Sequence, residues 1–185
     1  EAWIDRQSLQ EGYPEILEDW FTNGMLNQWC IDMGKINLGY PENDFANHPF
    51  APTCLFETGV ATMEQFPIKG VVWYQGESNA HNMEAHEKLF TLLVGSWRKY
   101  WDNPQMPFHF VQLSSLNRPS WPWFRDSQRR LAEAVPHCGM AVSSDVGDSL
   151  DVHPRQKKPV GERLGRIALH DDYGFKTVPC GPVFT

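Results

Sequence analysis

The sequence has no block of lysine and arginine and no long run of apolar residues. It holds 16 Lys and Arg against 23 Asp and Glu, which gives a net charge of −7. A nucleic-acid surface needs clustered positive charge, so this balance argues against nucleic acid as a partner. A membrane-spanning helix needs about 20 consecutive apolar residues, and no run approaches that length. We therefore expect neither nucleic acid nor a membrane as a partner.

Cysteine is scarce and widely spaced. The chain has four, Cys30, Cys54, Cys138 and Cys180. They form no Cys-x-x-Cys pair, which disfavours a zinc site, and the sequence leaves open whether they are buried thiols or form one or two disulfides. A metal-dependent hydrolase using His81, His86 and His153 is also disfavoured, because His81 and His86 have a poor ligand spacing on a helix.

The composition is that of a globular protein with many aromatic side chains. Hydrophobic residues make up 41% of the chain and charged residues 21%, which is enough for a packed core. The length suits one domain, which we predict over residues 1–185, with a long loop at 34–60 and an exit toward a possible further domain at 178–185. The eight tryptophans are either core residues or sugar-stacking platforms.

Apolar periodicity predicts a mostly helical start over residues 1–33 and an alternation of strands and helices from residue 68 onward. Strands are predicted at 69–74, 108–113 and 140–143, and helices at 80–101, 124–134 and 158–170. Such alternation is typical of parallel strands joined by right-handed crossovers. We therefore expect a three-layer α/β/α fold with a mainly parallel sheet.

Polar side chains follow the first of these strands, in the segment Trp73-Tyr74-Gln75-Gly76-Glu77-Ser78-Asn79-Ala80. In open α/β sheets, ligands bind at the carboxyl ends of the strands. The amides of Gln75 and Asn79 are suited to donate hydrogen bonds to a developing oxyanion. Glu77 either orients a neighbour or caps the next helix. Ser78 is either a nucleophile, although it lacks a Gly-x-Ser-x-Gly elbow, or a helix N-cap.

A second polar segment, Asp151-Val152-His153-Pro154, follows the strand predicted at 140–143. Pro154 favours an extended backbone at His153, and in an extended chain residues i and i+2 point to the same side. Asp151 and His153 can therefore pair as the carboxylate and imidazole of a hydrolytic triad do. The alternative is a solvated aspartate beside a loop histidine. We expect the two polar segments to form one active site.

These segments resemble sialate O-acetylesterases and related carbohydrate acetylesterases of the SGNH hydrolase group. The likeness rests on residues 71–80, with further matches at 123–128, 139–148 and 151–164. It covers residues 68–185 well and residues 4–67 only loosely. The resemblance implies an SGNH (flavodoxin-like) fold and a serine ester hydrolase that needs no metal or organic cofactor. It also implies an O-acetylated sugar as substrate, above all sialic acid, and an exported location: periplasmic, secreted or lysosomal.

By position, the resemblance makes His153 the general base and Asp151 its carboxylate partner. Many SGNH enzymes have Asp-x-x-His, which would put the acid at Leu150, so two alternatives remain: Asp145 or Asp148 as the partner, or an enzyme that works largely as a Ser–His pair. The oxyanion and substrate contacts are expected from Gln75, Gly76, Glu77, Asn79 and Arg125. Arg125 is a candidate for the sialic acid carboxylate, or else a surface residue.

The resemblance further implies a nucleophilic serine in a Gly-Gln-Ser-Asn motif. None of the ten serines of this chain lies in such a motif. We expect the nucleophile and the first strand of the sheet to lie upstream of Glu1, and the 185-residue chain alone to be inactive. Two alternatives stay open: a relative that only binds carbohydrate, and an enzyme acting on acetylated xylan or another glycan.

Overall fold

The computed structural model describes residues 1–40, 48–64 and 66–182. These residues form two compact units, and the chain passes from one to the other three times. The helical unit comprises Glu1–Pro67 and His81–Pro104, and the sheet unit comprises Ile68–Ala80 and Gln105–Thr185. All the predicted site residues belong to the sheet unit.

The described residues of the helical unit form four α-helices and two short 3-10 helices. They are α1 (Arg6–Gly12), η1 (Pro14–Leu17), α2 (Gln28–Leu38), α3 (Cys54–Thr58), η2 (Val60–Met63) and α4 (Met83–Tyr100). The α4 helix confirms the helix predicted at 80–101, and it begins at Met83 because the Asn82 side chain caps it by accepting from the Ala85 N–H. Its apolar face buries Phe90, Leu93 and Trp97.

The prediction of a loop at 34–60 was wrong near both ends of the segment, where the structure has helices. The α2 helix runs on to Leu38 and stops at Gly39, whose left-handed backbone (φ +65°) is typical of a helix C-terminus. Near the other end, Cys54–Thr58 forms α3. Residues 41–47 of this segment, and residues 183–185 of the predicted exit, lie outside the described residues.

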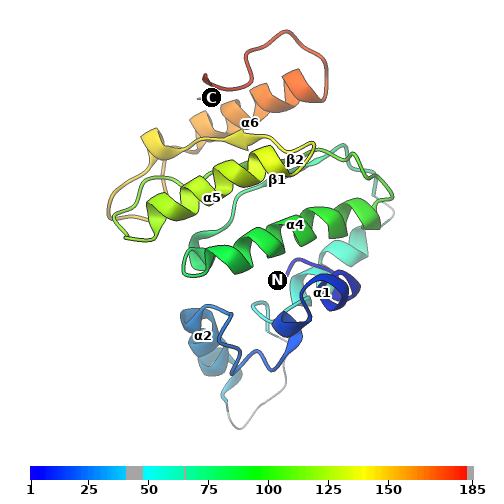
Figure 1. The fold of residues 1–185 in the computed structure, drawn as a ribbon, viewed down its shortest axis with the longest axis vertical. Helices are drawn as coiled ribbons and strands as arrows, with labels where there is room; N and C mark the ends of the chain where they lie inside the picture. Colours follow the sequence, from blue (N-terminus) through cyan, green and yellow to red (C-terminus); the bar gives the residue numbers. More distant parts are fainter. Residues whose placement is uncertain (41–47, 65, 183–185) are drawn as a thin grey trace. The chain divides into compact units, whose positions relative to one another are not determined.

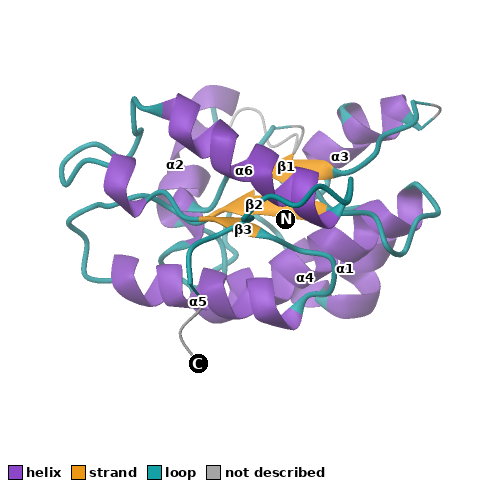
Figure 2. Ribbon diagram, turned by 90° about the horizontal axis from the view of Figure 1, so that it is seen from above, coloured by secondary structure: helices purple, strands orange, loops and turns teal. Residues whose placement is uncertain are grey.

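The sheet unit has the predicted three-layer α/β/α arrangement with a parallel sheet. Its strands are β1 (Val71–Trp73), β2 (Phe108–Val111) and β3 (Met140–Ala141), in the order β1-β2-β3. Its helices, α5 (Trp121–Ala134) and α6 (Lys157–Asp171), lie on opposite faces of the sheet (Figures 1 and 2). Each predicted strand is present but shorter, because only part of each apolar run pairs with a neighbour.

The central strand, β2, contacts both helix layers through alternate side chains. His109 and Val111 face α6: His109 Nε2 lies 2.7 Å from Asp172 Oδ2, and Val111 packs in a cluster with Val160. Phe108 and Phe110 point to the opposite face. All four side chains are buried, which explains why this strand reads as a continuous apolar run.

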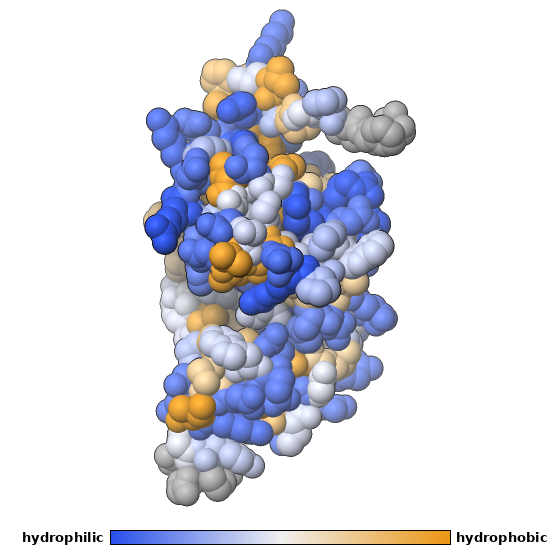
Figure 3. Space-filling model, turned by 90° about the vertical axis from the view of Figure 1, so that its left-hand side faces the viewer, coloured by the Kyte–Doolittle hydropathy of each residue, from blue (hydrophilic) through white to orange (hydrophobic). Residues whose placement is uncertain are grey.

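One face of the molecule shows how its apolar surface side chains are distributed. On the face shown in Figure 3, apolar side chains lie in small groups among polar ones. Within the described parts of the chain, no helix is long and apolar enough to cross a membrane. The four cysteines all belong to the described residues, and none of them forms a disulfide there.

Candidate active site

The segment after β1 folds into a tight turn whose polar groups bond to one another. Gly76 has a φ of +149°, and a Cβ at this position would come within 3.1 Å of the Phe124 ring of α5. Its N–H donates to Glu77 Oε2 (3.0 Å), and Asn79 Nδ2 donates to Gln75 Oε1 (3.3 Å). The turn therefore requires glycine and fixes the Gln75 side chain by its oxygen.

The Gln75 amide nitrogen is the donor that this turn leaves available. Its Nε2 donates to no acceptor among the described residues, whereas the Gly76 N–H is taken by Glu77. Residues Glu77–Asn79 form the short helix η3, and the cap of α4 is Asn82 rather than Glu77 or Ser78. A ligand oxygen beside Gln75 would find a fixed, neutral donor.

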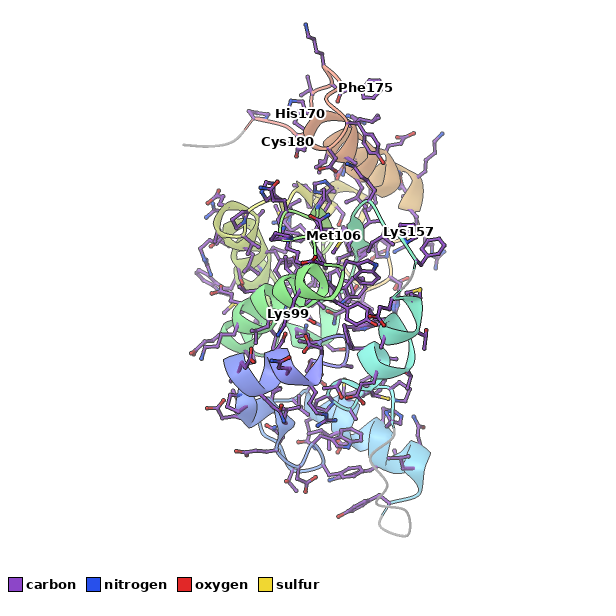
Figure 4. The ribbon with its side chains drawn as sticks, turned by 90° about the vertical axis from the view of Figure 1, so that its right-hand side faces the viewer. Lys99, Met106, Lys157, His170, Phe175 and Cys180 are labelled. Carbon is purple, nitrogen blue, oxygen red and sulfur yellow. The ribbon has the colours of Figure 1, made fainter. Side chains whose placement is uncertain are left out.

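Tyr74 joins the end of β1 to the beginning of α6. Lys157 Nζ lies 4.5 Å from the centre of the Tyr74 ring, and Figure 4 shows Lys157 at the beginning of that helix. The Tyr74 hydroxyl is buried and has no hydrogen-bond partner among the described residues. Its burial raises the pKa of that hydroxyl, and the nearby Ser143 and Ser114 side chains only partly oppose the rise, so it stays protonated.

Two buried glutamines connect β2 to α5. Gln128 Oε1 accepts the Leu113 N–H at 2.9 Å. Gln112 Nε2 donates to the Arg125 carbonyl (2.8 Å), and Gln112 Oε1 accepts from Arg125 Nη2 (3.3 Å). Arg125 Nε is buried without a partner among the described residues, and desolvation lowers the pKa of the guanidinium. Arg125 is thus half-buried, held by Gln112, and retains an unused donor.

Reasoning from the sequence missed Gln112 and Gln128. A signal was present for Gln128, which lies between Phe124 and Leu131 at helical spacing, on the buried face of α5. A polar residue in such a position must find a buried partner. The partners of Gln128, however, lie at the end of β2 and just after it, and no local pattern identifies them.

Asp151 and His153 lie together in the loop that follows the short helix η4 (Ser144–Val146). Asp151 Oδ1 accepts the His153 backbone N–H at 2.8 Å, while His153 Nδ1 is 3.8 Å from the same oxygen. The imidazole is therefore beside the carboxylate but not hydrogen-bonded to it, and its side chain is 84% exposed. Catalytic hydrogen bonds are often this long without substrate. The sequence predicts this pair just after the third strand. In the structure, η4 lies between β3 and the pair.

The two alternative carboxylates are engaged elsewhere. Both oxygens of Asp145 accept from Arg163 of α6 at 2.6 Å, and Arg163 Nη1 also donates to the Val142 carbonyl at 2.7 Å. Asp148 Oδ1 accepts the Leu150 N–H at 2.8 Å. Of the three, Asp151 is the carboxylate that lies beside His153. Arg163 anchors the beginning of the loop that carries it.

The Arg163 pair predicts a specific acid sensitivity. Hydrogen bonds from Arg163 lower the pKa of Asp145 from 3.8 to about 2. Because the folded state holds this proton less tightly, the pair stabilises the fold fully above pH 3.8, and the effect is lost as pH falls toward 2. We expect the gap in thermal midpoint between the wild type and Asp145→Asn to be constant near neutral pH and to shrink between pH 4 and about 2. Arg163→Met should give the same profile. A gap of equal size at pH 2 and pH 6 would contradict this assignment.

The predicted site residues form separate groups in the structure. The loops after β2 and β3 are joined, since Ser143 Oγ donates to the Gln112 carbonyl at 2.6 Å. Yet no hydrogen bond or ion pair among the described residues connects His153 to the turn at 75–79 or to Arg125. The catalytic and binding roles of these residues stay predictions. The described residues hold no cluster of three or more His, Cys, Asp or Glu suited to a metal ion.

A family model and similar curated proteins agree on one family. Residues 53–170 match the family model described as carbohydrate esterase, sialic acid-specific acetylesterase. The chain is 33% identical over 152 residues to the sialate O-acetylesterase of Mus musculus, covering 70% of this chain and 28% of that protein. It is 30% identical over 157 residues to the sialate O-acetylesterase of Homo sapiens, covering 73% and 30%.

A solved structure agrees with the sequence comparisons. The crystal structure of a carbohydrate acetylesterase from Xanthomonas citri matches with a TM-score of 0.68 and 35% sequence identity, covering 72% of this chain and 33% of that one. The fold class predicted from the sequence is therefore confirmed. The chain spans 28% and 30% of the length of the mouse and human relatives.

Proposed function

The chain belongs to the sialic acid-specific acetylesterase family of carbohydrate esterases, and from this we propose that it hydrolyses O-acetyl esters of sugars, with O-acetylated sialic acid as substrate. The observation that carries the proposal is the extent of the family match. It runs over residues 53–170 and so includes both the turn at 75–79 and the Asp151–His153 pair. An exported location is part of the same proposal.

In the proposed mechanism, His153 removes the proton of a serine hydroxyl as that oxygen attacks the acetyl carbonyl. The imidazolium then protonates the sugar oxygen that leaves, and the acetyl-enzyme is hydrolysed by water activated in the same way. Asp151 orients the imidazole and stabilises its positive charge. The exposure of His153 supports this role, because a substrate can reach its ring.

The proposed oxyanion donor is the Gln75 amide. It is fixed through its oxygen by Asn79 and leaves Nε2 for the developing negative charge. Gly76 and Glu77 hold the turn in shape, and Arg125 contributes a partly buried cation to the substrate site. The nucleophilic serine is proposed to come from sequence upstream of Glu1, since no serine of this chain lies in the motif expected for it.

A second candidate substrate is an acetylated plant glycan. It is supported by the 35% identity to the carbohydrate acetylesterase from Xanthomonas citri. The two candidates share the chemistry of the acetyl ester and differ in the sugar. They can therefore be separated by offering both substrates to one protein.

Acetate release from O-acetylated sialic acid and from acetylated xylan tests the proposal. It should be measured for the 185-residue chain and for a chain joined to its upstream sequence, with His153→Ala as the background in each. We expect no difference from background in the first form and activity on sialic acid in the second. Activity of the 185-residue chain above its background would place the nucleophile inside it, with Ser78 the first residue to replace. A folded longer chain that releases acetate from neither substrate would leave a carbohydrate-binding relative as the remaining reading.

A further inference from the structure

A hollow of about 310 Å³ adjoins the Asp151–His153 pair. It is formed by residues 116–118, which follow β2, and residues 149–152, which come directly before His153. The two segments are joined where the Asn117 N–H donates to the Ser149 carbonyl at 2.9 Å. The volume is at the lower end of the range for ligand pockets, so it suits one sugar unit rather than a long chain.

Arg118 supplies the positive charge of this hollow. Its guanidinium lies 5.6 Å from the centre of the Trp121 ring. Trp121 is buried, and its indole N–H donates to the Ser114 carbonyl at 2.6 Å, so the ring is a fixed platform. Backbone bonds from Arg118 N to Leu116 O and from Trp121 N to Arg118 O, both 3.0 Å, hold the segment.

The Arg118 charge has no partner within the chain. In the described residues no carboxylate lies within ion-pair distance of it, whereas Arg163 is paired with Asp145. A guanidinium presents a planar fork of donors that matches a carboxylate in bidentate fashion. An exposed arginine held on an aromatic ring and left unpaired beside a cavity is therefore suited to an anionic ligand.

The charged residues that line the hollow would orient a bound ligand. Among the described lining residues, Arg118 is the one cation and Asp151 the one anion, and they belong to different segments of the wall. A carboxylate must avoid Asp151 and lie on Arg118, which leaves the rest of the sugar toward His153. Leu150 is 88% exposed, so an apolar group of the ligand, such as a methyl, would cover a side chain now facing water.

We propose that Arg118 and this hollow bind the carboxylate of an acidic sugar, which makes Arg118 a specificity-determining residue of the site. The inference rests on the proposed function and deepens it. It also assigns the carboxylate to Arg118 rather than to Arg125, because Arg125 is already engaged by Gln112 through both its side chain and its carbonyl.

Binding by the 185-residue chain itself tests this, with N-acetylneuraminic acid and its carboxyl methyl ester as probes. These differ in one negative charge. Titration followed by ¹⁵N–¹H spectra should show the acid binding about 10-fold more tightly than the ester, with shifts at the Trp121 indole and at Asn117. Arg118→Gln should bind both probes at the level of the ester, and Arg118→Lys should keep part of the preference. Arg166→Gln, at an exposed arginine of α6 that does not line the hollow, is the matched control and should retain the full preference.

Three results would overturn the inference: equal binding of acid and ester, a preference that survives Arg118→Gln, or one lost in Arg125→Gln instead. Acetate release by the longer chain separates this from the proposed function. Hydrolysis that depends on His153 but ignores the charge of the sugar would sustain the esterase and reject the role of Arg118. Charge-dependent binding without any hydrolysis would sustain the role of Arg118 and reject the esterase.

Discussion

Replacement of His153 by alanine is expected to lower kcat/KM for acetate release by at least about 10³-fold while leaving the thermal midpoint unchanged. The loss is expected because His153 is the proposed general base. The stability should not change because the His153 side chain is 84% exposed, and substitutions at exposed positions usually have little effect on the free energy of unfolding. The measurement uses the chain joined to its upstream sequence and acetylated sialic acid as substrate.

The same assay identifies the carboxylate partner. Asp151→Asn should cost about 10²-fold, less than His153→Ala, because in the proposed mechanism it misorients the base without removing it. Asp148→Asn is the matched control, since its carboxylate accepts the Leu150 N–H rather than facing His153. A larger loss of kcat/KM in Asp148→Asn or Asp145→Asn than in Asp151→Asn would show that Asp151 is not the carboxylate partner of His153.

Replacement of Trp121 by alanine is expected to lower the free energy of unfolding by about 3–5 kcal/mol. Trp121 is almost fully buried at the beginning of α5, and its indole N–H satisfies the Ser114 carbonyl at the end of β2. The alanine variant loses the ring and also leaves that buried carbonyl unpaired. Urea unfolding of the 185-residue chain is the measurement.

Two further variants separate the parts of this effect. Trp121→Phe keeps a ring and loses the hydrogen bond, so it should cost only about 1–2 kcal/mol. Trp123→Ala removes a neighbouring tryptophan that is 68% exposed and should cost less than about 0.5 kcal/mol. Equal losses at Trp121 and Trp123 would mean that burial at the beginning of α5 does not stabilise the sheet unit.

Much of the sheet unit could be predicted because its signals are local. The apolar runs that became β1, β2 and β3, and the periodicity of α5 and α6, are properties of short windows. The prediction of a loop at 34–60 failed at α3, where the local sequence pattern does not indicate a helix. The residues of α3 sit among Gly, Pro and Asn, and a five-residue helix is too short for periodicity to show.

Local sequence is enough to predict which strand ends carry amides, which loop carries an aspartate and a histidine, and which family these motifs resemble. These are facts about neighbours along the chain. The partners of these groups depend on the folded arrangement. It paired Asp145 with Arg163, left the Gln75 amide without an acceptor, and placed Arg118 on Trp121 beside a hollow that reaches Asp151. Contacts such as that between Asn117 and Ser149 join segments distant in sequence. They arise from packing of strands and helices, which no short window of residues contains.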